Sequence, residues 1–146
     1  MGISNAEWDV MRVVWVREEA TSNLIFMILS SQRQWSLSTI KTLLKRLVDK
    51  GYLRTKRQGK GYVYSALISE DEAMNVQIDA HFAKYCAQKH PFILGHLLEK
   101  TDMTKADILA LQTILAQKKE VDVILCDCIP GQCQCKEHLE GDAKHE

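Results

Sequence analysis

The fold of this chain is decided by the stretch Trp35-Ser-Leu-Ser-Thr-Ile-Lys-Thr-Leu-Leu-Lys-Arg-Leu-Val-Asp-Lys-Gly51. Ser36 is a suitable N-cap and Gly51 a C-terminal stop, so the stretch predicts one helix that runs to Lys50. Its apolar residues recur at helical spacing and form one stripe: Ile40, Leu43, Leu44, Leu47 and Val48. The opposite face is polar and largely basic: Ser38, Lys41, Thr42, Lys45 and Asp49, flanked by Thr39, Arg46 and Lys50. The helix is therefore amphipathic, with hydroxyls and cations on its outer face.

The segments on either side of this helix are also patterned. After Gly51, residues 52–55 and 62–65 predict two strands around the basic, glycine-bearing tip Lys56-Arg57-Gln58-Gly59-Lys60-Gly61. Before it, Ser4 and Glu7 form a capping box for a first helix, and Thr21-Ser22 opens a short second helix. Three short helices followed by a basic hairpin predict a winged helix-turn-helix, in a chain that is mainly α with a small β-wing. An ordinary α+β domain would explain the apolar stripe but not the basic hairpin.

The charge of the chain is unevenly distributed. The formal net charge is zero, but residues 1–68 hold eleven Lys/Arg against five Asp/Glu, a net charge of +6, and residues 69–146 carry −6. A basic segment of this kind indicates a nucleic-acid binder, and a helix with a small polar face fits the major groove. We therefore expect double-stranded DNA to contact these residues of the third helix and the wing: Ser38, Thr39, Lys41, Thr42, Lys45, Arg46, Lys56, Arg57 and Lys60.

Four of the five cysteines lie in one short segment near the end, Cys126-Asp-Cys128-Ile-Pro-Gly-Gln-Cys133-Gln-Cys135. Pro130-Gly131 predicts a turn that brings the two C-x-C pairs together. Four thiolates at one centre suit Zn(II), Cu(I) or an iron–sulfur cluster, and disulfides across the turn are the alternative in an oxidising compartment. We expect Cys126, Cys128, Cys133 and Cys135 to bind metal, with His138 and His145 as weaker candidate ligands. Cys86 is predicted to be a small buried residue.

The segment between these two regions predicts helices that need a partner. Ser69 and Glu72 form a capping box for a helix to about Lys89, His90-Pro91 breaks it, and a last helix begins at Thr104. About fifty residues in roughly three helices bury little apolar surface by themselves. We therefore expect these helices to pack against a second copy of the chain in a homodimer. The alternative is a monomer that folds them back on the first domain. The expected division is 1–68 DNA-binding domain, 69–120 dimerisation region and 121–146 metal-binding tail.

Several function classes lack support in the sequence. No apolar run approaches the about 20 residues of a membrane span, and the N-terminus lacks the pattern of a signal peptide, so we expect a cytoplasmic protein without a membrane partner. No Ser/His/Asp or carboxylate constellation predicts hydrolysis, and a thiol oxidoreductase would typically carry C-x-x-C. We therefore expect a protein that is not an enzyme.

Three segments resemble the BlaI/MecI/CopY repressor family. Residues 3–15 resemble its first helix, Trp35–Gly51 its recognition helix and Gly61-Tyr-Val-Tyr64 the end of its wing, although Leu24–Leu29 is more apolar than usual there. The two C-x-C pairs resemble those of the copper-responsive CopY branch. This resemblance implies a homodimer that binds a palindromic operator with Zn(II) bound and releases it when Cu(I) displaces zinc.

Two alternative functions and one further partner follow from parts of the same evidence. A β-lactam-type repressor with an incidental metal tail would leave the four cysteines unused. A thiol-rich copper buffer or metallochaperone would leave the winged helix unused. A copper metallochaperone that delivers the inducing ion is a further candidate partner.

Overall fold

The computed structural model describes residues 2–135, which fall into two compact units divided between Ala80 and His81. None of the described helices is both long and apolar enough to cross a membrane. The division of the chain into three functional parts stays a prediction.

The first unit begins with three helices around one core. These are α1 (Asn5–Arg17), α2 (Ser22–Leu29) and α3 (Leu37–Asp49), each with the N-cap that the sequence predicts. Ser4, Thr21 and Ser36 accept hydrogen bonds from the backbone N–H groups of Glu7, Leu24 and Thr39, so each helix start is satisfied locally. The core between the helices contains side chains with 0% exposure, among them Met11, Val14, Ile25, Ile40, Leu44 and Leu47.

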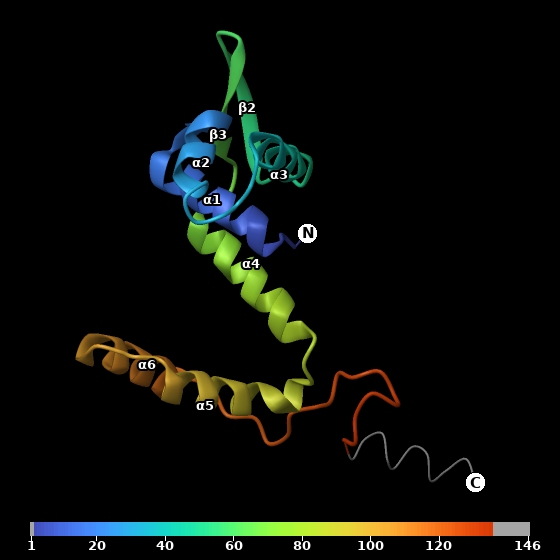
Figure 1. The fold of residues 1–146 in the computed structure, drawn as a ribbon. Helices are drawn as coiled ribbons and strands as arrows, with labels where there is room; N and C mark the ends of the chain where they lie inside the picture. The colour runs from blue at the N-terminus through green and yellow to red at the C-terminus, as the bar shows by residue number, and fades with distance from the viewer. Residues whose placement is uncertain (1, 136–146) are drawn as a thin grey trace. The chain divides into compact units, whose positions relative to one another are not determined.

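A three-stranded antiparallel sheet completes this unit, with strand order β1-β3-β2. β2 (Leu53–Gln58) pairs with β3 (Gly61–Ala66) from Leu53–Ala66 to Gln58–Gly61, and the hairpin projects beyond the three helices (Figure 1). Gly59 adopts a φ of +61° in the two-residue turn, a conformation that suits glycine. The predicted winged helix is confirmed. Its strands are longer than expected, so Lys56 and Arg57 lie within β2 rather than in the loop.

The short strand β1 (Glu19–Thr21) was not predicted from the sequence. It follows α1 directly and pairs with β3, Ala20 opposite Tyr64, on the edge of β3 that β2 leaves open. Ala20 is 2% exposed, and the positive φ of 64° at Glu18 turns the chain from the helix into the strand. β1 therefore joins the hairpin to the helical core.

Two contacts hold α1 against distant parts of the first unit. Trp15 Nε1 donates to the carbonyl oxygen of Ile68 at 2.9 Å, and Lys50 Nζ lies 2.7 Å from Glu7 Oε2. Glu7 is the single charged residue among the described ones that is buried, at 2% exposure. Since Lys50 is the C-cap of α3, this ion pair ties the end of that helix to the start of α1.

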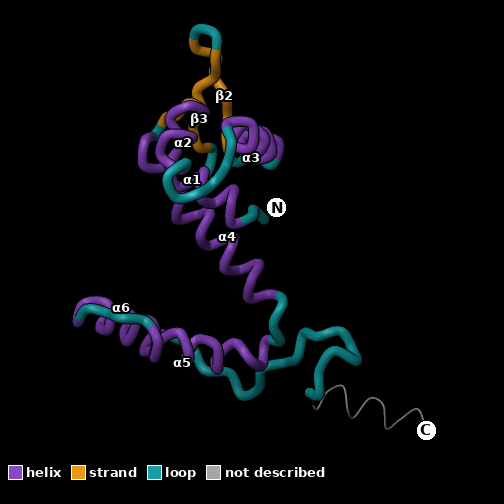
Figure 2. Tube along the Cα trace, in the orientation of Figure 1, coloured by secondary structure: helices purple, strands orange, loops and turns teal. Residues whose placement is uncertain are grey.

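The remaining elements are helical (Figure 2): α4 (Glu70–Ala83), the 3₁₀ turn η1 (Ala87–Lys89), α5 (His90–Lys100) and α6 (Lys105–Gln117). The prediction that His90-Pro91 ends a helix was wrong, because α4 ends at Ala83 and Pro91 lies in the first turn of α5. Proline is favoured there, since its missing N–H would have no partner within the helix.

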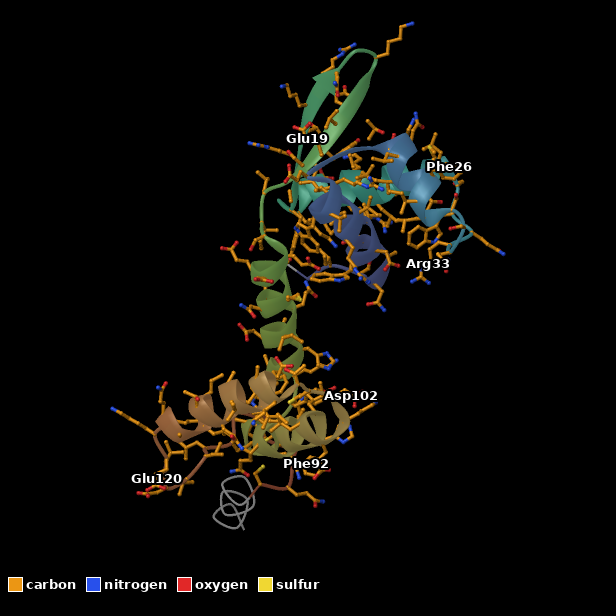
Figure 3. All side chains as sticks on the ribbon, turned by 90° about the vertical axis from the view of Figure 1, so that its left-hand side faces the viewer. Glu19, Phe26, Arg33, Phe92, Asp102 and Glu120 are labelled. Carbon is orange, nitrogen blue, oxygen red and sulfur yellow. The ribbon has the colours of Figure 1, made fainter. Side chains whose placement is uncertain are left out.

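The helices α5 and α6 contain no buried residue. Phe92, labelled on α5 in Figure 3, is 77% exposed. Seven further large apolar side chains on these helices are exposed: Leu94, Leu97, Leu98, Ile108, Leu109, Ile114 and Leu115. This apolar surface lacks a covering partner in the described chain.

Candidate nucleic-acid interface and metal centre

The two faces of α3 differ as the sequence predicts. Ile40, Leu44 and Leu47 have 0% exposure and pack in the core. The predicted DNA-facing side chains lie outside that core: Ser38, Lys41, Thr42, Lys45 and Arg46 are exposed and Thr39 is half-buried. An apolar inner stripe thus fixes the helix to its domain and leaves the hydroxyl and cationic side free.

Hydrogen bonds decide what the hydroxyls on α3 can offer. Thr42 Oγ1 donates to the carbonyl oxygen of Ser38 at 3.0 Å, so its proton is engaged while its oxygen lone pair and methyl group stay accessible. Thr39 Oγ1 lies 3.1 Å from Ser36 Oγ, within the N-cap of the helix. Thr42 therefore presents an acceptor and a methyl group, and Thr39 belongs largely to the helix start.

The cations of this region fall into two groups. Lys45 pairs with Asp49 at 3.2 Å on the exposed face, and Lys50 is directed to Glu7 instead. The other predicted phosphate-binding side chains are exposed and form no ion pair within residues 2–135: Lys41, Arg46, Lys56, Arg57 and Lys60. The helix face and the hairpin therefore carry positive charge that is available to an anionic partner.

The loop that leads into α3 is held by Arg33, which sequence reasoning did not single out. Arg33, labelled in Figure 3, lies 2.8 Å from Asp9 Oδ2 on α1 and 5.9 Å from the centre of the Trp35 ring. A guanidinium between a carboxylate and an indole fixes the chain just before the Ser36 cap. A lone arginine in a polar loop carries no sequence signal for this role.

The tail cysteines gather around a turn, as the sequence predicts. Gly131 has a φ of +94°, and the Gln132 backbone N–H donates to the carbonyl oxygen of Ile129 at 3.0 Å. Across this turn Cys126 Sγ lies 3.5 Å from Cys133 Sγ, and the sulfurs of Cys126, Cys128 and Cys133 all lie within 4.8 Å of one another. The turn thus brings Cys133 beside the first C-x-C pair, whereas Cys135 lies in a second three-sulfur set with Cys126 and Cys86.

Cys86 also lies in this cluster, although the sequence predicted an inert buried residue. Its Sγ is 3.7 Å from Cys126 Sγ and 3.6 Å from Cys135 Sγ, and it is half-exposed. No spacing rule connects it with a tail about forty residues later. The one sequence feature that could have pointed to Cys86 as a member of the cluster is that it is the fifth cysteine, and the other four all lie in the tail.

The sulfur separations fit a tetrahedral thiolate site. With Zn–S bonds of about 2.3 Å, tetrahedral geometry places neighbouring sulfurs about 3.8 Å apart, close to the 3.5 Å between Cys126 Sγ and Cys133 Sγ in the tail. All five cysteines are free thiols. Among the described residues no histidine joins a candidate ligand set, and His138 and His145 lie outside the described residues.

The thiols of the cluster differ in acidity. The backbone N–H of Gln88 donates to Cys86 Sγ, which lowers the pKa of that thiol. The pKa of Cys128 is raised because its thiol donates to Cys86, and that of Cys135 is raised chiefly by its bond with Cys133. Lys84 and Lys89 line the same hollow, which has a volume of about 1300 Å³.

Known proteins resemble this chain over most of its length. The sequence model of the penicillinase repressor family matches residues 3–117. An uncharacterised 16.5 kDa protein of Latilactobacillus sakei is 38% identical over 92% of this chain and 93% of its own. The methicillin resistance regulatory protein MecI of Mammaliicoccus sciuri is 32% identical over 80% of this chain and 94% of its own. A solved CopR repressor structure is 43% identical over 47% of this chain and all of its own, with a TM-score of 0.41.

Proposed function

Because this chain belongs to the penicillinase repressor family, we propose that it is a transcriptional repressor whose hold on DNA is released by copper. Family membership and the winged helix make it a repressor with a DNA-binding domain. The finer proposal is a Zn(II)-loaded homodimer on a palindromic operator, which dissociates when Cu(I) is bound in place of zinc. Copper-homeostasis genes would then be expressed.

The exposed face of α3 supports a direct contact with DNA in the major groove. Ser38 and Thr42 are short enough for the helix to approach base edges, and Thr39 lies at the helix start, where backbone N–H groups favour phosphate. Lys41, Lys45 and Arg46 on the helix and Lys56, Arg57 and Lys60 on the hairpin supply cations for phosphates on either side of the groove.

The exposed apolar side chains of α5 and α6 support the homodimer. Leu109 is 52% exposed and Ile114 61%, and large apolar side chains left in water favour association with a complementary surface. A second copy of the same helices supplies that surface in a symmetric dimer. Two winged helices related by a twofold axis match a palindromic operator.

The single observation that carries the copper proposal is the thiol cluster, with sulfurs 3.5–3.7 Å apart on a repressor scaffold. When Zn(II) is bound, Cys126, Cys128, Cys133 and Cys135 supply a closed four-sulfur set. Cu(I) is softer and favours thiolates at lower coordination number, so the same residues can exchange one metal for the other and rearrange. Each thiol loses its proton to solvent on binding, and no sulfur is oxidised.

Fluorescence anisotropy with a labelled palindromic promoter fragment tests this proposal. The zinc-loaded protein should bind the fragment, and Cu(I) added under anaerobic, reducing conditions should release it. In the matched control all four tail cysteines are changed to serine, whose hydroxyl is a far poorer ligand for a soft metal. That variant should lose its zinc and no longer respond to Cu(I).

Two results would refute the proposal. Release of the quadruple variant by Cu(I) would show that the tail is not the sensor, as in a β-lactam-type repressor with an incidental metal tail. Failure of the zinc-loaded protein to prefer any palindromic fragment over random DNA would favour a copper buffer.

A further inference from the structure

We propose that the thiolate of Cys86, in the turn after α4, is a fifth ligand of the copper-bound form, in addition to the four thiolates of the tail. This inference rests on the proposed copper response of the tail. It adds a residue from outside the C-x-C motif, on an element that belongs to the helical part of the chain.

The arrangement of sulfurs gives Cys86 a defined place. The described thiols form two three-sulfur sets, Cys126–Cys128–Cys133 and Cys86–Cys126–Cys135, which share Cys126. Each set is compact enough for one soft ion, since its sulfurs lie within 4.8 Å of one another. Cu(I) favours low coordination by thiolate, so two ions bridged by the shared sulfur would use all five cysteines. Tetrahedral Zn(II) needs four, and the tail supplies those alone.

Contacts that involve no sulfur hold the tail against the turn that carries Cys86. The backbone N–H of Ala87 donates to Asp127 Oδ1 at 2.9 Å, and Gln88 Nε2 donates to the carbonyl oxygen of Ile124 at 2.9 Å. These bonds join the residues directly after Cys86 to the residues directly around Cys126. The approach of the two sulfurs therefore follows from backbone docking as well as from thiol contacts.

Excess anionic charge at a five-thiolate site needs compensation, and the surroundings provide it. Lys84 and Lys89 line the same hollow as Cys86, Cys128 and Cys135. Two Cu(I) ions with five thiolates leave a negative centre, which nearby ammonium groups stabilise. The acidic tail itself offers no such cation between Cys126 and Cys135.

A metal–thiolate bond to Cys86 would also connect the tail to the helical part of the chain. Cys86 lies three residues after the end of α4, and the same helix buries Ala73 in the core of the DNA-binding unit at 0% exposure. A metal bond to Cys86 would therefore act on the chain three residues after α4, in addition to the hydrogen bonds that already join this turn to the tail.

The test compares Cys86→Ser with the unchanged full-length protein and with the quadruple tail variant. Zinc content, Cu(I) affinity against a chromophoric chelator and sulfur coordination by X-ray absorption are measured anaerobically with a phosphine reductant. Cys86→Ser should retain zinc and operator binding. Its Cu(I) affinity should fall by roughly tenfold or more, because even the outer partners of a metal site contribute about 10–100-fold.

A second variant separates ligation from docking. Gln88→Ala removes the side-chain bond to the carbonyl oxygen of Ile124 but leaves every thiol and the Asp127 carboxylate in place, so it should weaken Cu(I) binding less than Cys86→Ser and keep the copper–sulfur coordination number. Equal Cu(I) affinity and coordination in Cys86→Ser and the unchanged protein would overturn the role of Cys86 while the tail response stands. An unaltered response of the quadruple variant would instead refute the proposed function, and the inference with it.

Discussion

Replacing Lys50 by methionine tests whether the ion pair with the buried Glu7 holds α3 against α1. Lys50 Nζ donates to both carboxylate oxygens of Glu7, at 3.0 and 2.7 Å, and to the carbonyl oxygen of Gly2 at 3.2 Å. In Lys50→Met the Glu7 carboxylate, 3% exposed, keeps one hydrogen bond from the Ser4 backbone N–H at 3.4 Å. The variant therefore leaves a buried charge almost without compensation.

The structure gives the size of the effect. Removing one partner of a fully buried ion pair costs about 3–5 kcal/mol. The Lys50 side chain is 24% exposed, so water reaches part of the site and the expected loss in free energy of unfolding is reduced to about 2–3 kcal/mol. With a urea dependence of about 1.5 kcal/mol per molar, the midpoint should fall by about 1–2 M.

Urea unfolding followed by tryptophan fluorescence measures this loss in the first unit, because all three tryptophans of the chain lie in that unit: Trp8, Trp15 and Trp35. Lys45→Met is the matched control on the same helix. Its pair with Asp49 is exposed, at 77% and 63%, and such pairs contribute about 0–1 kcal/mol. The control should therefore unfold close to the unchanged protein.

A second substitution tests whether the unpaired charge of Glu7 causes the loss of stability. Glu7→Gln removes the charge and keeps a side chain that can still close the capping box with Ser4. In the Lys50→Met background it should restore stability, since the orphaned charge is gone. If Glu7→Gln destabilised Lys50→Met further, or if Lys50→Met unfolded like Lys45→Met, the buried charge would not be the reason for the pairing.

Three further predictions concern DNA and assembly. Arg57→Ala should weaken operator binding and reduce the slope of log K against log salt by about one unit, measured by anisotropy, whereas Lys119→Ala in the other half of the chain should leave the slope unchanged. Thr42→Ala should lower operator affinity by about 1–3 kcal/mol and random-DNA affinity much less, and an equal loss on both would assign Thr42 to the backbone. Leu109→Glu should convert the proposed dimer to a monomer in sedimentation experiments, while Val16→Glu on α1 should not; a dimer that survives Leu109→Glu would exclude α6 from the interface.

The winged helix could be predicted because its information is local. Ser36, the apolar stripe from Ile40 to Leu47 and the two strands around Gly59 each follow a short-range rule, and all agree. β1 could not be predicted in this way. Glu19-Ala20-Thr21 is too short to show alternation, and it forms a strand because β3 has an open edge beside it.

The turn after α4 shows how one residue can signal two different structures. His90-Pro91 was read as the end of a long helix, since proline cannot continue one. Proline is equally suited to a helix start, and the sequence rule does not choose between them. The helix stops because Cys86 has an extended backbone, with φ −52° and ψ 134°, and the Ala87 backbone N–H bonds to Asp127 of the returning tail instead of to a helical carbonyl.

The same returning tail explains why the thiol cluster was found only in part. The spacing of the two C-x-C pairs around Pro130-Gly131 predicts the turn, and with it the set of Cys126, Cys128 and Cys133. Cys86 is separated from the tail cysteines by η1, α5 and α6. It lies beside Cys126 because the chain after α6 returns to the residues that follow Cys86. Such a meeting depends on tertiary docking through Asp127 and Gln88, which carry no motif of their own. In the proposed copper-bound form, the bond from Cys86 would join the metal site to the helical part of the chain.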